Sequence, residues 1–179
     1  RTPSGADAFA LFPQPTPGAP NPGNGGNCTV TTTTLNLLPM ISTWSYNRDG
    51  FDLGTAWRAP DYDDSGWLTG LALLGVEDCG CLPFSLNTPF PSYSNTQVPY
   101  YFRTSFLVDT NLAGLDLTLT YVLDDGAVIY LDGVELTRIR MPLGTITVST
   151  LPTAVVNNAT AETLALAGIN LASGTHHLA

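Results

Sequence analysis

The sequence contains no lysine, two histidines and three cysteines, and only 12% of its residues are charged. All six basic residues are therefore arginine, and fifteen acids bring the net charge to −9. A chain this acidic lacks the basic face that binds phosphates, which excludes nucleic acid as a partner and disfavours anionic membrane surfaces. Without lysine, Schiff-base catalysis is excluded as well.

Long apolar runs are also missing. None approaches the ~20 residues needed to cross a bilayer, so we expect no membrane insertion. No signal peptide is recognisable and the chain begins at Arg1, so we interpret it as a mature or cut fragment of a longer protein. Hydrophobic residues nevertheless make up 44% of the 179 residues, which is enough for one core of ordinary size.

The clearest pattern lies in residues 115–139. Apolar residues alternate with polar ones from Leu115 to Leu123, as in a half-buried strand. Asp124-Asp125-Gly126 interrupts this strand, and two further strands at 127–131 and 134–139 flank Asp132-Gly133, a strong hairpin signal. We therefore predict a central β-meander and an all-β fold.

The rest of the chain predicts further strands and two irregular stretches. We expect strands at 29–34, at 40–46 with a continuation through 51–57, at 100–108 and at 145–150. Residues 77–99 contain four prolines and read as a long loop. Residues 1–27 hold six prolines and five glycines, typical of a linker or docking tail, and we assign 28–179 to one β-sandwich domain.

A series of motifs spans about residues 40–179. It consists of Trp44-x-Tyr46, Asp52-Leu53-Gly54-x-x-Trp57-Arg58, Asp63-Asp64-Ser65-x-Trp67, Gly70, Tyr101-Phe102-Arg103-x-x-Phe106, Asp124-Asp125-Gly126-Ala127-Val128-x-Tyr130-Leu131-x-Gly133-Val134-Glu135 and Arg138. Together these motifs resemble the galactose-binding-like jelly-roll modules of large bacterial secreted and surface proteins. The resemblance implies a jelly-roll β-sandwich and an extracellular or cell-surface location, but it leaves the ligand open because this fold hosts many roles.

Two features at the ends of the chain extend this resemblance. Thr16-Pro17-Gly18-Ala19-Pro20-Asn21 resembles the closing motif of bacterial lamin-tail-type domains, which implies an upstream domain. In the jelly-roll family the final Gly-Thr-x-x-Leu-Ala is followed by more strand residues, so the resemblance implies that the last strand is lacking here. We hypothesise that residues 8–12 of a neighbour, through Phe9, Leu11 and Phe12, cover the open edge.

Candidate catalytic and metal-binding residues are few. Asp61, Asp63 and Asp64 offer oxygens that suit a structural calcium ion, but they match no defined calcium loop, and we favour Asx-turn chemistry. His176 and His177 are adjacent and would point to opposite faces of a strand, so they cannot share one metal. No serine lies in a Gly-x-Ser-x-Gly elbow. We predict a non-catalytic chain with no cofactor apart from such a calcium ion.

The three cysteines suit an oxidising compartment. We expect Cys28 to pair with Cys79 or Cys81, which leaves one thiol free or bonded to another chain. Closing a loop of this size stabilises the fold by roughly 4 kcal/mol in the chain-entropy model.

Aromatic residues in the 77–99 loop leave two functions open. Phe84, Phe90 and Tyr93 either stack on a sugar or pack within the loop, and the sequence does not decide between these roles. The favoured function is a structural or adhesive module that associates with neighbouring copies or domains, including in a surface polymer. The alternative is a carbohydrate-binding accessory module of a larger secreted enzyme, with glycans as partners.

Overall fold

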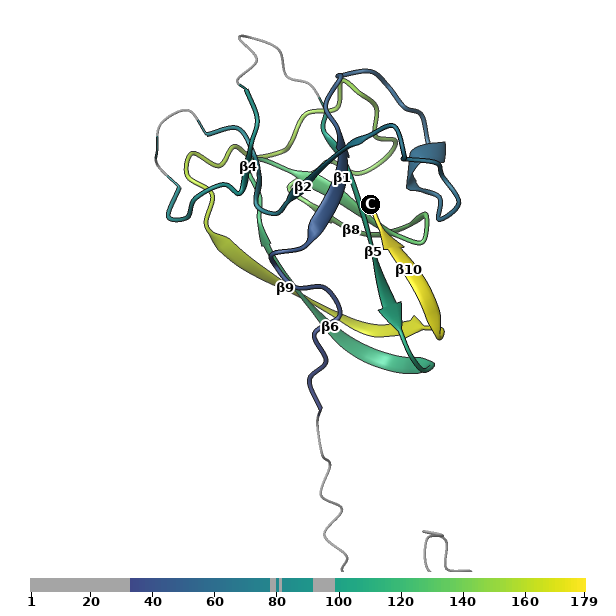
Figure 1. Ribbon diagram of the computed structural model, residues 1–179. Helices are drawn as coiled ribbons and strands as arrows, with labels where there is room; N and C mark the ends of the chain where they lie inside the picture. Colours follow the sequence, from purple (N-terminus) through teal and green to yellow (C-terminus); the bar gives the residue numbers. More distant parts are fainter. Residues whose placement is uncertain (1–32, 78–79, 81, 92–98) are drawn as a thin grey trace, which may run out of the picture. The chain divides into compact units, whose positions relative to one another are not determined.

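The computed structural model describes residues 33–77, 80, 82–91 and 99–179 of the chain. The chain divides into two compact units, Arg1–Leu35 and Asn36–Ala179, and the second unit carries all the strands described below (Figure 1). Among the described residues this unit is all-β, with one short 3-10 helix, η1 (Ala56–Arg58). No helix in this part of the chain is long and apolar enough to cross a membrane.

The larger sheet has six strands in the order β2-β1-β5-β10-β7-β8, and all its neighbouring pairs are antiparallel. Its strands are β1 (Thr43–Asn47), β2 (Leu68–Leu71), β5 (Tyr101–Val108), β7 (Ala127–Leu131), β8 (Val134–Ile139) and β10 (Gly174–Leu178). Strand β10 lies between β5 and β7, so the last strand in the sequence order occupies the interior of this sheet.

A second layer consists of two long antiparallel strands, β6 (Leu112–Val122) and β9 (Ala161–Leu171), which form a separate ribbon (Figure 1). A short parallel pair, β3 (Leu74–Gly75) with β4 (Thr88–Pro89), fastens the loop region to the rest of the unit. The fold is thus an all-β arrangement of mainly antiparallel sheets, as the sequence predicts.

The predicted hairpin at Asp132-Gly133 is confirmed. Leu131 pairs with Val134 across the turn, and Asp132 and Gly133 have φ values of 50° and 81°, as a type I′ turn requires. The predicted meander is wrong, however, because β6 pairs with β9 and not with β7. Asp124-Asp125-Gly126 therefore carries the chain from one sheet to the other. Alternation along β6 identified a half-buried strand but contained no information about its partner.

Two other predicted strands are also wrong. Residues 51–57 form a turn and η1, because the Asp52 carboxylate accepts the amide of Gly54 at 2.8 Å and Gly54 has a φ of 63°. Residues 145–150 form a hydrogen-bonded turn, in which Thr150 Oγ1 accepts the Thr147 amide at 2.8 Å. In both places a hydroxyl or carboxylate oxygen accepts a hydrogen bond from a nearby backbone amide, which favours a turn over a strand. Of the strand expected at 29–34, residues 33 and 34 are not in a strand and the others lie outside the described residues.

The strands predicted at 40–46 and 100–108 are confirmed as β1 and β5, with small shifts at their ends. Val108 and Leu171 are the most completely buried hydrophobic side chains, both 2% exposed. An aromatic cluster fixes η1 to one face of the large sheet. There the Trp57 ring meets the rings of Tyr101 and Tyr130 at 4.8 and 5.8 Å. We call this side the η1 face. Tyr101, Arg103 and Ser105 of β5 lie on it, and the residues between them lie on the opposite face.

Candidate functional site

A buried arginine fastens the segment 55–67 to the η1 face. Arg103 is 2% exposed, and its Nε donates to Asp64 Oδ2 at 3.1 Å. Its Nη1 donates to the carbonyl oxygens of Trp57 and Ala59, and its guanidinium carbon lies 5.5 Å from the centre of the Tyr62 ring. A buried guanidinium needs such partners, because an unpaired buried charge is strongly destabilising. Arg103 thereby fixes a loop that forms one wall of a concavity.

That concavity, the polar cleft, has a volume of about 230 Å³. Strands β1, β5 and β10 supply residues to it, and the segment 55–67 adds two side chains. It is lined by Thr43, Ser45, Tyr62, Asp64, Arg103, Thr104, Ser105 and His177. The cleft therefore combines hydroxyl groups, a phenol ring, a carboxylate, a guanidinium and an imidazole.

The three predicted calcium candidates lie in the segment that borders this cleft. Asp63 Oδ1 accepts the Ser65 amide at 3.0 Å, and hydrogen bonding from Ser65 lowers the pKa of the Asp63 carboxyl. This is the Asx turn that the sequence predicts. Asp64 is bound to Arg103, and Asp61 is exposed. In the part of the chain that the structure describes, no three acid, histidine or cysteine side chains are grouped to hold a metal ion.

The two histidines point to different surroundings, as the sequence predicts for neighbours on a strand. His176 is 8% exposed; its Nδ1 lies 2.6 Å from Asp132 Oδ2 and its Nε2 lies 2.9 Å from the Ala172 carbonyl oxygen. The Ala172 carbonyl, followed by the Asp132 carboxylate, raises the pKa of His176 despite its burial. Asp132 Oδ1 also accepts the His177 amide at 2.8 Å, so the hairpin turn is joined to β10.

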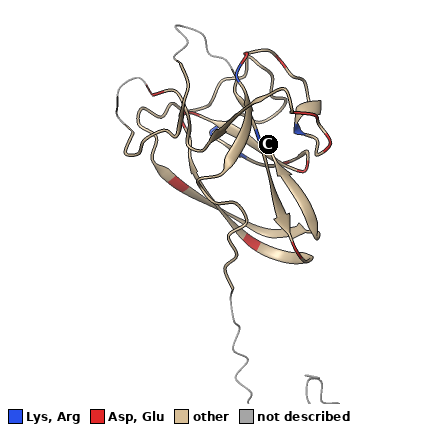
Figure 2. Ribbon diagram, viewed as in Figure 1, with Lys and Arg blue, Asp and Glu red and all other residues tan. Residues whose placement is uncertain are grey.

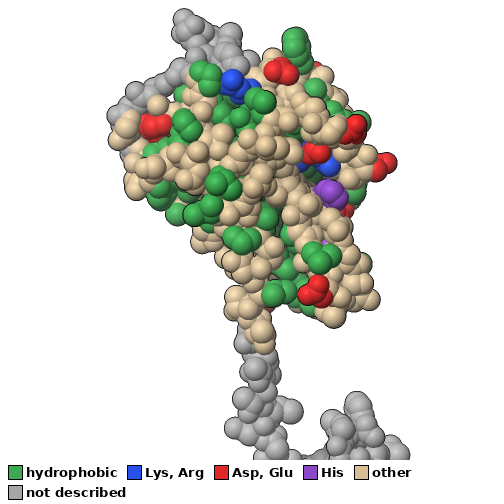
Figure 3. All heavy atoms as spheres, viewed as in Figure 1, with side chains coloured by type: hydrophobic (Ala, Val, Ile, Leu, Met, Phe, Trp, Pro, Cys, Tyr) green, Lys and Arg blue, Asp and Glu red, His purple; other side chains and the backbone are tan. Residues whose placement is uncertain are grey.

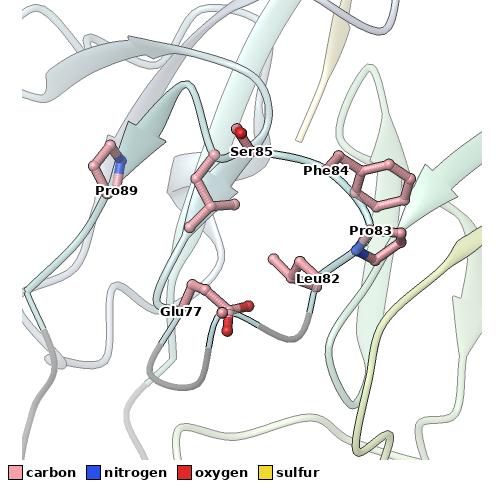
Figure 4. Close-up of a pocket in the computed structure, with 8 residues that line it drawn as sticks. Glu77, Leu82, Pro83, Phe84, Ser85 and Pro89 are labelled. Carbon is pink, nitrogen blue, oxygen red and sulfur yellow. The ribbon is translucent and has the colours of Figure 1, made fainter.

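The aromatic loop residues have different environments. Phe90 is 7% exposed and its ring lies 4.7 Å from that of Tyr46 and 6.4 Å from that of Phe102. This placement favours packing over ligand binding for Phe90. Phe84 is half-buried and borders a loop pocket of about 450 Å³, which is lined by Glu77, Gly80, residues 82–86 and Pro89. In Figure 4 the Phe84 ring points away from Pro89 and Glu77, so it is poorly placed to stack on a ligand in that pocket.

Several predicted site residues lie outside the described residues. They are Tyr93 of the aromatic loop, the cysteines Cys28, Cys79 and Cys81, and the docking residues Phe9, Leu11 and Phe12. The expected disulfide and the expected docking contacts stay predictions.

The β6–β9 ribbon leaves much apolar surface incompletely covered. Its strands are paired only with each other in the described part of the chain. On one face, Leu117 lies opposite Leu166 and Leu119 opposite Leu164, and all four are half-buried. Leu171 is the one buried residue of these two strands. Each strand carries a single charged side chain, Asp116 or Glu162 (Figure 2).

The segment between β8 and β9 adds further exposed apolar side chains. Leu143 is 95% exposed and Val155 is 78% exposed, and Val148 and Leu151 are also exposed. Hydrophobic side chains reach the surface at several places on the side seen in Figure 3. Single exposed apolar residues are normal, but four in one irregular segment favour contact with another surface.

Sequence reasoning missed the polar cleft and the central role of Arg103. Arg103 belonged to one of the quoted motifs, yet nothing local indicated that it would be buried. A single arginine between Tyr101 and Ser105 on one face of a strand is the one available signal, because a charge on an otherwise half-buried face needs a partner. Its partners, Asp64 and the carbonyl groups of Trp57 and Ala59, lie about forty residues away.

Comparison with protein-family models, curated proteins and solved structures finds no match to this chain.

Proposed function

We propose that this chain is a non-catalytic structural and adhesive module of an extracellular or cell-surface protein, and that it associates with neighbouring copies by strand addition to the β6–β9 layer. The observation that carries this proposal is the row of half-buried leucines on β6 and β9. Apolar side chains in a complete sandwich are buried between two layers of similar width, and an added strand would bury this row further.

The edges of the layer support the same proposal. Each strand is 11 residues long, and in the described part of the chain each has one long edge without a strand partner. Natural proteins protect such edges with lysines, prolines, inward-pointing charges or β-bulges, and the register shifts of this pair lie only between Leu112 and Leu117. The chain has no lysine, and β6 and β9 contain no proline and one acid each. An incoming strand would satisfy the free backbone groups and cover the leucines together.

The sequence supplies a candidate donor for this strand. Phe9 and Leu11 recur at period two and alternate with Ala8 and Ala10. A strand of this pattern places Phe9 and Leu11 on one face, and Ala8 and Ala10, followed by Phe12, on the other. That pattern complements a layer whose leucines all lie on one face.

We also propose that the two layers form a jelly roll. The strand order of the large sheet supports this, because strands distant in the sequence, such as β5 and β10, are neighbours while β6 and β9 form the facing layer. Crossing between layers at Asp124-Asp125-Gly126 and again after β9 is typical of such folds.

The experiment is sedimentation velocity of the full chain over a wide concentration range. We expect a concentration-dependent oligomer that is lost in a Phe9→Ser/Leu11→Ser variant. The matched control, Ala8→Ser/Ala10→Ser, changes the same segment on its opposite face and should assemble like the unmodified chain. A chain that stays monomeric at every concentration, or equal assembly of both variants, contradicts the proposal.

A further inference from the structure

His176 of β10 bridges two turns through the two nitrogens of its ring. Its Nδ1 lies 2.6 Å from Asp132 Oδ2 in the β7–β8 turn, and its Nε2 lies 2.9 Å from the carbonyl oxygen of Ala172, the residue that follows β9. The ring is buried and stacks on Phe106 of β5, with 5.6 Å between the ring centres. One side chain thus joins the end of the β6–β9 ribbon to the large sheet.

Both partners of the His176 ring are hydrogen-bond acceptors. A carbonyl oxygen cannot donate a hydrogen bond, and neither can an ionised carboxylate. The charged imidazolium has an N–H on each nitrogen and satisfies both partners, whereas the neutral imidazole has a single N–H. The neutral ring therefore has to turn a lone pair toward one of its two acceptors. The positions of these atoms require a proton on both nitrogens of His176 for both contacts to persist.

The strengths of the two hydrogen bonds decide which one the neutral ring loses. An N–H bonds more strongly to a carboxylate than to a carbonyl group, because charge-assisted hydrogen bonds are roughly twice as strong as neutral ones. The Asp132 carboxylate is also held by the His177 amide, which donates to its Oδ1 at 2.8 Å. Ala172 is exposed, so water can replace the ring at its carbonyl group. The contact with Ala172 should therefore fail first.

We infer that His176 is a proton-dependent switch, which holds the turn after β9 through the Ala172 carbonyl group when it is charged and releases that turn when it is neutral, with its remaining N–H kept on Asp132. This inference goes beyond association between copies and does not depend on it.

The charges around His176 set the pH at which the switch operates. In the described part of the chain, Asp132 is the charged side chain that acts on His176, and the neighbouring His177 points to the opposite face of β10. The Ala172 carbonyl, followed by Asp132, raises the pKa of His176 above its ordinary value of about 6.5, although burial lowers it. Both contacts are thus fully present below pH ~6.5, and the contact with Ala172 is lost as the pH rises through the folded pKa. The other charged side chains of the surrounding elements are exposed or paired elsewhere: Asp109 after β5, Asp116 of β6, Glu162 of β9 with Arg140, and Glu135 of β8 with Arg138.

The test is NMR spectroscopy of the isotope-labelled full chain between about pH 5.5 and 8.5, a range that includes the ordinary histidine pKa of about 6.5. The chemical shifts of the ring nitrogens report which nitrogen carries a proton. We expect both nitrogens of His176 to be protonated at the low end of the range and Nδ1 alone at the high end. The carbonyl carbon signal of Ala172 should shift with the same midpoint as the His176 ring.

Asp132→Asn separates loss of the Ala172 contact from a mere change of charge. The amide group of the new side chain can donate to Nδ1, so the neutral ring can keep its own N–H on the Ala172 carbonyl. We expect the neutral ring of this variant to carry its proton on Nε2, and the Ala172 signal to lose most of its pH-dependent shift. Asparagine suits the positive φ of 50° at this position, so the turn should be retained.

His177→Ala is the matched control, because it removes the neighbouring histidine, whose ring makes no hydrogen bond to a described residue. Its Ala172 signal should titrate as in the unmodified chain. A neutral His176 that carries its proton on Nε2 in the unmodified chain overturns the inference. So does a His176 ring that does not titrate in this range, an Ala172 signal that does not follow it, or an undiminished Ala172 shift in Asp132→Asn.

Discussion

Arg103 gives the sharpest prediction about stability. Replacing it in an Arg103→Met variant keeps an apolar stem of similar length but removes the donors to the Asp64 carboxylate and to the carbonyl oxygens of Trp57 and Ala59. Hydrogen bonds to charged groups contribute about 1.5–3 kcal/mol each, and breaking a buried ion pair costs about 3–5 kcal/mol. The Asp64 side chain is 30% exposed, so water partly replaces its lost partner.

The expected loss in the free energy of unfolding is therefore about 3 kcal/mol, at the lower end of the range for a broken buried ion pair. For a chain of this size, each kcal/mol shifts the melting temperature by about 2–4 °C, so the melting temperature should fall by roughly 10 °C. Urea unfolding followed by tryptophan fluorescence measures the free energy directly, because Trp57 lies in the segment that Arg103 fastens.

Asp64→Asn is the matched control for this measurement. It removes the negative charge but keeps an oxygen acceptor for Arg103 Nε, and its partly exposed pair should lose only about 1 kcal/mol. If Arg103→Met loses no more than Asp64→Asn, the two carbonyl bonds contribute nothing, and our account of how segment 55–67 is held is wrong.

Two further predictions concern the β7–β8 turn and its contact with β10. Hydrogen bonds to the Ala172 carbonyl and to Asp132 raise the pKa of His176 above its unfolded value of about 6.5. The charged imidazole therefore stabilises the fold fully below pH ~6.5, and this stabilisation is lost as the pH rises through the folded pKa. NMR titration of the imidazole should show that Asp132→Asn, which keeps a residue suited to the positive φ of 50°, lowers the His176 pKa; an unchanged pKa contradicts the assigned contact. Gly133→Ala should destabilise the chain by about 1–2 kcal/mol in thermal unfolding, because φ is 81° at this position. Gly66→Ala is the control and should be neutral or slightly stabilising, because an added Cβ meets nothing within 4 Å there and φ is not in the left-handed region.

Local chemistry was readable from the sequence wherever a few adjacent residues decide the structure. Asp132-Gly133 fixes its turn because both positions need positive φ, and Asp63 fixes its turn through the Ser65 amide two residues away. The same local chemistry explains why the strand predictions at 51–57 and 145–150 are wrong. There the side chains of Asp52 and Thr150 accept hydrogen bonds from backbone amides that a strand would use for pairing.

The partners of strands that lie far apart in the chain could not be predicted from the sequence. Leu119 and Leu164 lie 45 residues apart in the chain and face each other in the structure, but each strand's alternation is equally compatible with other partners. The polar cleft depends on two such pairings, because β5 must lie between β1 and β10 before Ser45, Ser105 and His177 can meet.

Several residues of the motifs quoted from the sequence pack around η1. The Tyr101 hydroxyl donates to the Phe51 carbonyl oxygen at 3.1 Å, the Trp57 ring contacts Tyr101 and Tyr130, and the guanidinium of Arg58 lies 4.6 Å from the centre of the Tyr130 ring. These contacts hold η1 on the large sheet. Thr43, Ser45 and His177 line the cleft but belong to none of the quoted motifs. Substitutions of Tyr101, Trp57 or Arg58 should therefore lower the free energy of unfolding, whereas substitutions of Thr43, Ser45 or His177 to alanine should leave it nearly constant.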